Sequence, residues 1–511
     1  MGNSDRIVPP DRAQSIFTAS ESPDIAVVGS GPAGSVAAIA LADRGLKVLL
    51  IEAGGSQVDA DATPYLDFSS AGTAHRVDFG MSMQIGGSTN LWSGRSARFE
   101  PGDISTDRGW PFDYAELLDH YRRAEEILEI RIPTDSPGVW PKGWESMTAA
   151  DLDLKRFVWS RPARNMAEVL AERLPDLPNL VVVQGTRCIR LKSHDGQVTS
   201  LTVAAAGKTY CVTAKRFVLA AGGLETARLL MASDIAQGLP AVGRFLGTHP
   251  KHGVGYIYLN RMVRLTSPLF VDSRRDGHWQ RHGLGLTEAA RKDGLNHYVQ
   301  LSPRFERFGE AMLDLGKSRL SASARKGGLG SSLQTRAAQT GRLAFNLMGR
   351  VGVFQQFASK LSVRGFFDQH PNPANGLTLL AERDPFGLPK AQVNWRLSEQ
   401  DFASIRTFLD TLSEHFRTAG IGQFVSSVPD HQSDWDMTGV HSHFMGTTRM
   451  GTRTENSVAD GHGRVHGQER LFLSGPGLFT TYSYANPVLT ITALALRVAE
   501  GVERSLGAAR T

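Results

Sequence analysis

The sequence feature that most constrains the fold is a glycine-rich turn between two short apolar strands near the N-terminus. Asp24–Val28 form the first expected strand, and Gly29–Gly34 (Gly-Ser-Gly-Pro-Ala-Gly) follow it directly. The alanine-rich run Ser35–Arg44 then predicts a helix that ends at Gly45, and Lys47–Glu52 form a second strand. Strand, turn, helix and strand in this order predict a βαβ unit.

The turn has the G-x-G-x-x-G spacing of a dinucleotide-binding site, with Pro32 and Ala33 inside the motif. Gly29 permits the tight turn, Gly31 lets the backbone approach a pyrophosphate, and Gly34 lets the helix pack closely on the strand. The start of the helix offers unpaired N–H groups and a positive dipole to the phosphates. The alternative interpretation is a glycine-rich turn in an ordinary α/β protein.

An acidic residue ends the second strand of this unit. Glu52 lies 18 residues after Gly34, where a carboxylate accepts hydrogen bonds from a ribose 2′-OH and disfavours the 2′-phosphate of NADP. FAD and NAD share this pattern, and the small residues that begin with Ala53 favour FAD.

Composition narrows the class of protein. The chain has 511 residues, enough for two or three domains, and its 21% charged and 41% hydrophobic residues exclude a disordered or fibrous chain. The two cysteines, Cys188 and Cys211, cannot crosslink so long a chain and form no metal-ligand cluster, so we expect a reducing, cytoplasmic compartment. We expect no secretory signal and no transmembrane segment, because glycines and Pro32 interrupt the most apolar stretch, Ile25–Ala42.

Regular patterning continues in two further parts of the chain. Helices are predicted over 113–127, 165–174 and 487–502, and strands over 180–183, 188–191, 198–203, 216–219 and 471–473. Residues 1–22 are predicted to form a loose polar arm, and residues from about 250 to 435 lose the regular rhythm and look like a separate region.

Three further segments resemble the glucose–methanol–choline (GMC) family of oxidoreductases. Gly86–Arg95 (Gly-Gly-Ser-Thr-Asn-Leu-Trp-Ser-Gly-Arg) looks like the flavin-contacting loop of that family, and Phe217–Leu230, which includes Ala221, resembles its second dinucleotide-contacting strand and turn. The run from His443 to Gly451, together with Asn486–Thr490, resembles the closing signature of the family. Only residues from about 250 to 435 match weakly.

The resemblance implies an α/β flavoprotein with two domains. A Rossmann-like FAD-binding domain would be assembled from residues 20–105, 175–250 and 436–511. A substrate-binding domain with an antiparallel sheet and helices would come from residues 106–174 and 251–435. By the same resemblance, the cofactor contacts would include Gly87, Asn90, Leu91 and Trp92 along the isoalloxazine, the backbone of Cys188 at the adenine, Gly475 at the pyrophosphate, and Ala221, Asn486 and Pro487.

Some family members attach FAD covalently through a histidine in the early loop. This chain has Asn90 near that place, so we expect FAD to be bound non-covalently. His75 lies upstream and remains an alternative attachment point.

The resemblance also supplies a catalytic pair. Alcohol oxidation by a flavin needs a base for the hydroxyl proton, which a neutral imidazole suits, and a polar group that holds the developing alkoxide. His443 matches the histidine and Asn486 matches the position that carries His or Asn in the family. His441 is a competing base because it would share a face with His443 in an extended segment, and a helix N-cap is the alternative role of Asn486.

Other sites are not expected. His249, His252, His462 and His466 are interpreted as structural or solvated histidines. No Cys or His spacing indicates a metal site, and no Gly-x-Ser-x-Gly elbow indicates a hydrolase.

The resulting hypothesis is FAD-dependent oxidation of a CH–OH group of a sugar, glycoside or related polyol. Oxidation of an aliphatic, aromatic or sterol alcohol, a redox-silent lyase of the same fold, and a non-enzymatic flavin-bearing protein remain alternatives. The electron acceptor would be oxygen, a quinone or another acceptor, so oxidase and dehydrogenase are both open.

Positive charge concentrates in one segment, 317–364, which has nine cations and no acidic residue. Without it the formal net charge changes from +5 to −4. Leu343, Leu347, Val351 and Phe354 recur at helical spacing, so a basic amphipathic helix is expected there. It could be a structural lid, dock on a membrane surface or redox partner, or accept an anionic substrate. Nucleic-acid binding is not expected, because no platform of regularly interleaved aromatic residues accompanies the charges.

Overall fold

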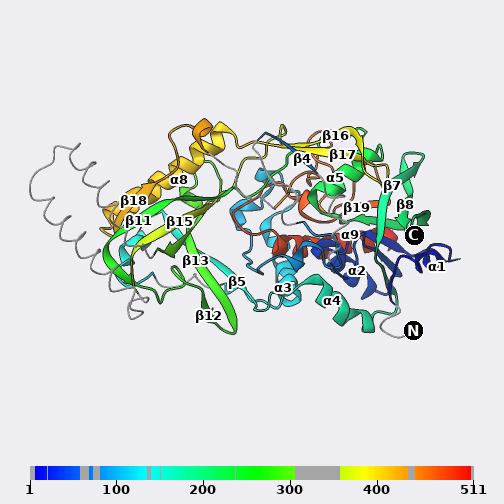
Figure 1. Ribbon diagram of the computed structural model, residues 1–511, viewed down its shortest axis with the longest axis horizontal. Coiled ribbons are helices and arrows are strands. Elements are labelled where there is room, and N and C mark those ends of the chain that lie inside the picture. Colours follow the sequence, from blue (N-terminus) through cyan, green and yellow to red (C-terminus); the bar gives the residue numbers. More distant parts are fainter. Residues whose placement is uncertain are drawn as a thin grey trace, which may run out of the picture.

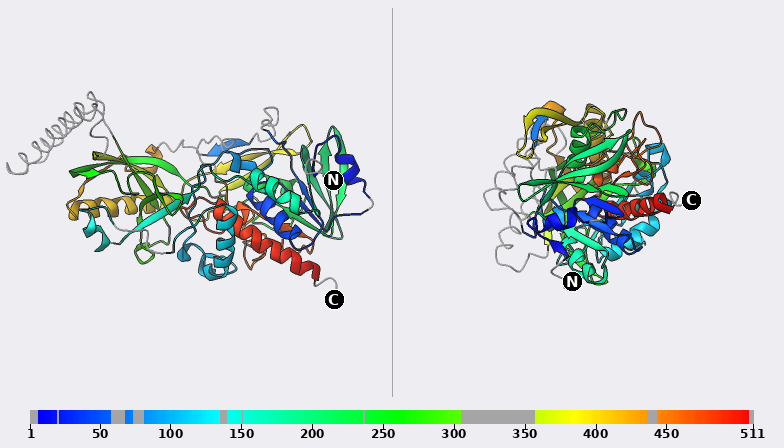
Figure 2. Two further views of the ribbon diagram at one scale, coloured as in Figure 1. Left: turned by 90° about the horizontal axis from the view of Figure 1, so that it is seen from below. Right: turned by 90° about the vertical axis from the view of Figure 1, so that its right-hand side faces the viewer.

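The computed structural model describes residues 6–19, 21–57, 68–72, 81–134, 140–149, 151–235, 237–304, 357–435 and 443–507. The molecule is elongated (Figure 1). A parallel sheet lies at one end with helices α2 (Pro32–Ala42) and α9 (Val488–Gly507), and an antiparallel sheet lies at the other end with helix α8 (Glu399–Thr418). The left panel of Figure 2 shows the same two-part arrangement from below.

The parallel sheet has six strands in the order β1-β6-β3-β2-β10-β19. They are β1 (Ile7–Val8), β6 (Leu180–Val183), β3 (Val48–Ile51), β2 (Ile25–Val28), β10 (Arg216–Leu219) and β19 (Leu471–Leu473). Every residue of β2 and β3 is buried, as expected for central parallel strands that are covered on both faces. Helix α2 (Pro32–Ala42) joins β2 to β3 and packs against the C-terminal helix α9 (Val488–Gly507). The predicted βαβ unit is therefore present.

The N-terminal arm differs from the sequence-based expectation. Instead of a loose segment, it contains β1, which pairs in parallel with β6 through Ile7 opposite Val182, and the short helix α1 (Ala13–Phe17). A strand of two residues is too short to show a hydrophobic period, so the pattern gave no signal for it.

The second sheet has seven strands, and all its pairings are antiparallel. Its order is β12 (Ser273–Arg275), β13 (His278–Leu286), β14 (Tyr298–Pro303), β15 (Phe357–Phe366), β11 (Lys251–Arg264) and β18 (Gly422–Ser426), with β5 (Leu152–Trp159) paired to β13. Helix α8 (Glu399–Thr418) buries Phe402, Ile405 and Phe408 in the same core cluster as the sheet residues Val299 and Val363. The region that lost its rhythm in the sequence thus contains a regular sheet and a helix.

Two small sheets and three helices complete the described fold. β16 (Gly376–Arg383), β17 (Pro389–Trp395) and β4 (Ser69–Gly72) form one sheet, and β7 (Thr186–His194), β8 (Gln197–Ala205) and β9 (Lys208–Thr213) form the other. The remaining helices are α3 (Leu118–Ile127), α4 (Met166–Arg173) and α5 (Gly222–Ala232). Within the described ranges, no helix combines the length and apolar character needed to cross a membrane.

The basic segment lies largely outside the described residues, which omit 305–356, and so does its predicted amphipathic helix. Its last part, from Phe357 onward, is strand β15 and not a helix. Lys360 and Arg364 are therefore strand residues of the antiparallel sheet.

Candidate active site

The glycine turn after β2 leaves room at the start of helix α2. A Cβ atom placed on Gly31 would meet no atom within 4 Å, whereas one placed on Gly34 would lie 1.8 Å from the carbonyl oxygen of Gly29. Gly34 is therefore needed for the close packing of α2 on β2, and Gly31 opens space in front of the helix N-terminus. The first N–H groups of a helix have no partner within it, so this space suits a pyrophosphate.

Glu52, directly after β3, is held by the same turn. Its carboxylate accepts hydrogen bonds from the Ser30 backbone N–H at 2.8 Å, the Ser30 hydroxyl at 2.6 Å and the Gly54 N–H at 2.8 Å. Burial raises the pKa of Glu52, and these hydrogen bonds oppose the shift. Glu52 also lines the pocket described next, so its oxygens are positioned to accept a ribose hydroxyl.

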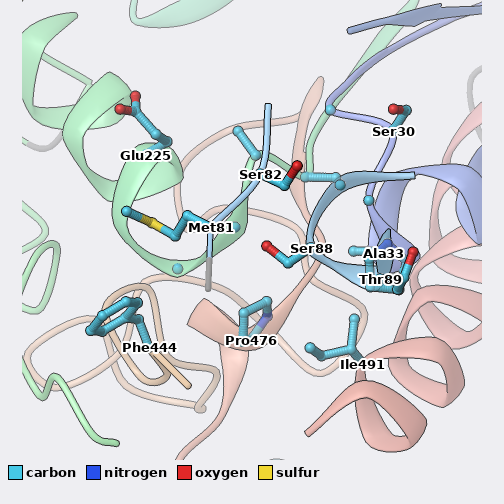
Figure 3. Close-up of a pocket in the computed structure, with 18 of the residues that line it drawn as sticks. Ser30, Ala33, Met81, Ser82, Ser88, Thr89, Glu225, Phe444, Pro476 and Ile491 are labelled. Carbon is cyan, nitrogen blue, oxygen red and sulfur yellow. The ribbon is translucent and has the colours of Figure 1, made fainter. Parts of the chain in front are cut away.

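A pocket of about 410 Å³ extends from the glycine turn to the second sheet. Figure 3 shows its walls, to which the turn contributes Ser30 and Ala33, the loop before Trp92 contributes Ser88, and α9 contributes Ile491. Of the residues assigned to cofactor or catalysis from the sequence, those that line it are Gly29, Gly31, Pro32, Ala33, Glu52, Ala53, Gly87, Leu91, Trp92, Cys188, Ala221, His443, Asn486 and Pro487. The structure thus brings residues from both ends and the middle of the chain to one cavity.

Three of the assigned residues lie behind this wall. Gly34 packs α2 on β2, as described above. Gly475 has φ of 125° and sits beside Ala33, and the next residue, Pro476, lines the pocket. Asn90 donates its amide N–H groups to the carbonyls of Ile85 and Gly87, both at 2.9 Å, and so fixes the shape of its own loop.

The strand β7 contributes Cys188 to the pocket. Its thiol is buried, and burial raises the pKa of Cys188 to about 12. A thiol in this state is not a nucleophile at neutral pH, so the side chain has no chemical role here. The fit to an adenine depends on the backbone of the strand.

Strand register brings two histidines, His249 and His443, side by side. Gly247 and Met445 form an isolated antiparallel bridge, in which each N–H donates to the carbonyl of the other at 2.9 Å. Residues two positions away on each side share a face of such a bridge, and these residues are His249 and His443. Their Nδ1 atoms lie 2.8 Å apart, with the two rings nearly perpendicular at 89°.

The contacts of His249 fix the proton on His443. His249 Nε2 lies 2.8 Å from the carbonyl oxygen of Tyr482, and a carbonyl only accepts, so Nε2 carries a proton. In the neutral form of His249, Nδ1 then accepts the N–H of His443 Nδ1. This tautomer places the lone pair of His443 on Nε2, as a general base requires.

Asn486 is oriented by a carbonyl as well. Its amide nitrogen lies 2.7 Å from the carbonyl oxygen of Arg95, which identifies that atom as the donor. One N–H of the amide is used in this way, and the second remains to donate to a substrate in the pocket that Asn486 lines. The helix-cap alternative needs the Asn486 oxygen to accept from α9, and the described contact of Asn486 runs instead to Arg95.

The other candidate histidines separate into two groups. His441 and His75 lie outside the described residues. His252 contacts the Gly253 carbonyl, His466 contacts the Ser457 hydroxyl, and His462 packs beside Gly501 of α9; these three histidines are not among the residues that line the pocket. No cluster of His, Cys, Asp or Glu in the described ranges could hold a metal ion.

Sequence reasoning interpreted His249 as structural or solvated and did not place it beside His443, and it gave no role to Arg95 or Lys251, which line the pocket. His249 and His443 are 194 residues apart in the sequence, so no local sequence pattern predicts that they pair. Arg95 stands inside the loop that carried the resemblance, which was the one available signal.

Comparisons with known proteins agree with this geometry. Residues 371–495 match the family model for GMC oxidoreductase, and residues 23–249 match the model for pyridine nucleotide-disulphide oxidoreductase. The chain is similar to paromamine 6′-oxidase of Streptomyces fradiae (25% identity; 94% of this chain and 92% of the relative). It is also similar to 2-methyl-1,2-propanediol dehydrogenase of Mycolicibacterium austroafricanum (24%; 95% and 96%).

The fold is shared with solved structures. Pyridoxine 4-oxidase from Mesorbium loti superimposes with a TM-score of 0.59 at 19% identity, over 94% of this chain and 99% of the other. An FAD-dependent oxidoreductase from Chaetomium thermophilum gives a TM-score of 0.58 at 14% identity, over 95% and 100%.

Proposed function

Since the chain belongs to the GMC oxidoreductase family, we propose that it oxidises a CH–OH group of a sugar, glycoside or related polyol to a carbonyl with FAD as cofactor. The observation that carries this proposal is that His443 and Asn486 line the same pocket as the dinucleotide-binding turn. The names of the relatives favour sugar-like substrates, since they include paromamine 6′-oxidase and fructose dehydrogenase large subunit.

His443, Asn486 and His249 have separate roles in the proposed reaction. His443 Nε2 accepts the hydroxyl proton of the substrate, and the free N–H of Asn486 donates to the hydroxyl oxygen as negative charge develops there. An amide does this without burying a charge. His249 keeps the proton of His443 on Nδ1. A bound FAD supplies the acceptor of the hydride.

The cofactor would be held by backbone and by one carboxylate. Gly31 and Gly475 would face the pyrophosphate, Glu52 the ribose, and the strand at Cys188 the adenine. Non-covalent binding is supported by Asn90, whose side chain braces its own loop. Acid precipitation should therefore release all the flavin into the supernatant, and flavin retained in the pellet would contradict this part of the proposal.

Anaerobic mixing with a panel of alcohols tests the reaction itself. We expect a sugar or polyol to bleach the flavin band near 450 nm, and His443→Ala to slow this bleaching about 10²- to 10⁴-fold, the usual contribution of a general base. An unchanged band with every alcohol would contradict alcohol oxidation and favour a lyase or a binding protein. Bleaching in His443→Ala that is lost only in His441→Ala would move the base to His441.

One relative supports a second substrate class. The 2-methyl-1,2-propanediol dehydrogenase is named for a small aliphatic diol, so such a diol belongs in the panel. Exposing the reduced enzyme to air, and separately to a quinone, identifies the acceptor. Cytoplasmic location and a peripheral contact through 317–364 stay predictions.

A further inference from the structure

One wall of the pocket belongs to the antiparallel sheet and is rich in cations. Register places Lys251 opposite Phe366 and Gln300 opposite Arg364, on strands β11, β14 and β15. Residues that alternate with them, such as Val299 and Val363, point into the core under α8, so this set occupies the other face. Lys251 lines the same pocket as His443 and Asn486.

Two of these cations gather at one aromatic ring. The Lys251 ammonium lies 5.5 Å and the Arg364 guanidinium 5.8 Å from the centre of the Phe366 ring. Within the part of the chain that the structure describes, neither makes an ion pair with a carboxylate. Burial and the neighbouring Arg364 lower the pKa of Lys251 to about 8.

The neighbouring carboxylate, Asp272, does not neutralise these cations. Asp272 is shared by Arg95 at 3.0 Å, Arg161 at 3.2 Å and Arg281 at 3.6 Å, so one carboxylate faces three guanidinium groups. Arg95 also lines the pocket and donates to Gln300 at 3.4 Å, which connects this cluster to the strands that carry Lys251 and Arg364.

We propose that the substrate is an alcohol that also carries an anionic group, a carboxylate or a phosphate ester, which Lys251 binds with Arg364 nearby while the hydroxyl lies between His443 and Asn486. This inference rests on the proposed function and specifies its substrate class. The partly buried ammonium of Lys251 has no counter-charge among the described residues, and an anionic substrate supplies that partner. The same wall repels an amino sugar that carries a positive charge.

Binding can be measured without turnover. Isothermal titration of the holoenzyme with cyclohexanecarboxylate and with its neutral amide, neither of which has a hydroxyl to oxidise, compares charge at constant shape. We expect the carboxylate to bind about 10- to 100-fold more tightly, as for a hydrogen bond to a charged group. This preference should weaken as the pH rises above about 8, because Lys251 then loses its proton.

Variants assign the preference to Lys251. Lys251→Met should abolish it, Lys251→Arg should retain most of it, and the matched control Lys208→Met, at an exposed lysine of β9, should leave it unchanged. Equal binding of the acid and the amide by the wild-type enzyme would overturn the inference.

Flavin reduction supplies the second measurement. The kcat/KM for glucuronate or glucose 6-phosphate, divided by that for glucose, should exceed one in the wild-type enzyme and fall in Lys251→Met. The same ratio for glucosamine should be lower. Comparing glucuronate with glucose 6-phosphate separates carboxylate from phosphate recognition. Equal losses for charged and neutral sugars in Lys251→Met would overturn the inference, because Lys251 would then act on the cofactor. If the acid binds but no alcohol reduces the flavin, the proposed oxidation fails and the anion site stands.

Discussion

Replacing His249 with leucine tests how the catalytic base is oriented. The change removes the nitrogen that accepts the N–H of His443 Nδ1, and it removes the donor to the Tyr482 carbonyl, both at 2.8 Å. The imidazole of His443 stays in the pocket, but nothing in the pair then selects which nitrogen carries the proton. We therefore expect a slower reaction with an intact cofactor site.

The size of the effect follows from what is lost. Each hydrogen bond contributes about 1 kcal/mol net, and a wrong tautomer of a catalytic histidine can cost as much as about 10⁴-fold in kcat when a buried carboxylate is lost. His249 is neutral and brings no charge, so we expect a smaller loss, about 10- to 100-fold in the rate of flavin reduction. The KM for substrate should change little, because His249 lies behind His443.

The assay is single-turnover flavin reduction under anaerobic conditions across pH 6 to 9, which isolates the chemical step. His249→Gln should recover part of the rate, since its amide offers one donor and one acceptor, as the imidazole does. His252→Leu is the control and should stay near the wild-type rate, because the described side-chain contacts of His252 run to its neighbour Gly253 and to the Trp435 ring. A wild-type rate in His249→Leu, or equal losses in the Leu and Gln variants, would refute the reasoning.

Three further predictions follow from individual contacts in the structure. Gly31→Val should raise the flavin dissociation constant about 100-fold in a fluorescence titration and leave the unfolding midpoint of the apoprotein unchanged, because the new side chain enters open space. Gly34→Ala should lower that midpoint, since its Cβ would lie 1.8 Å from a carbonyl oxygen. A stable Gly34→Ala apoprotein together with a destabilised Gly31→Val apoprotein would contradict this. Asn486→Asp should slow flavin reduction about 10²- to 10³-fold, because it replaces a donor by an acceptor, and a rate within threefold of wild type would argue against the role of the amide. Asp384→Ala should lower the free energy of unfolding by about 3 kcal/mol in chemical denaturation, because Arg228 loses a buried partner at 2.8 Å, and no measurable change would show that the pair is not stabilising.

The nucleotide-binding half could be predicted from the sequence because its signals are local. The turn Gly29–Gly34 carries its own spacing, and strands such as Leu180–Val183 are short apolar runs with the bounds that the structure gives to β6. The antiparallel sheet gave no such signal. Its long strand β11 is interrupted by bulges and alternates charged, aromatic and glycine residues, so its period of two is broken along the chain.

The contrast between local and long-range signals also explains which site residues could be predicted. His443 and Asn486 were found through segments that resemble a family, and the structure places both on the pocket. His249 and Lys251 could not be found, because their partners lie on strands far away in the sequence. Asn90 was assigned to the cofactor site from its loop, and the structure adds that its amide donates to the backbone of that loop, which the sequence cannot show.

The antiparallel bridge between Gly247 and Met445 constrains how this enzyme can diversify. His249 lies opposite the proposed base His443 across this bridge, and Lys251, two residues later, faces the pocket and is held by the pairing of β11 with β15. Inserting or deleting one residue between the two would disturb one of these pairings, because a slip of one residue turns a side chain to the opposite face. We therefore expect relatives that keep the His249–His443 pair but act on substrates of another charge to differ by a substitution at position 251. Their sequences should align with this one across 247–251 without insertions or deletions.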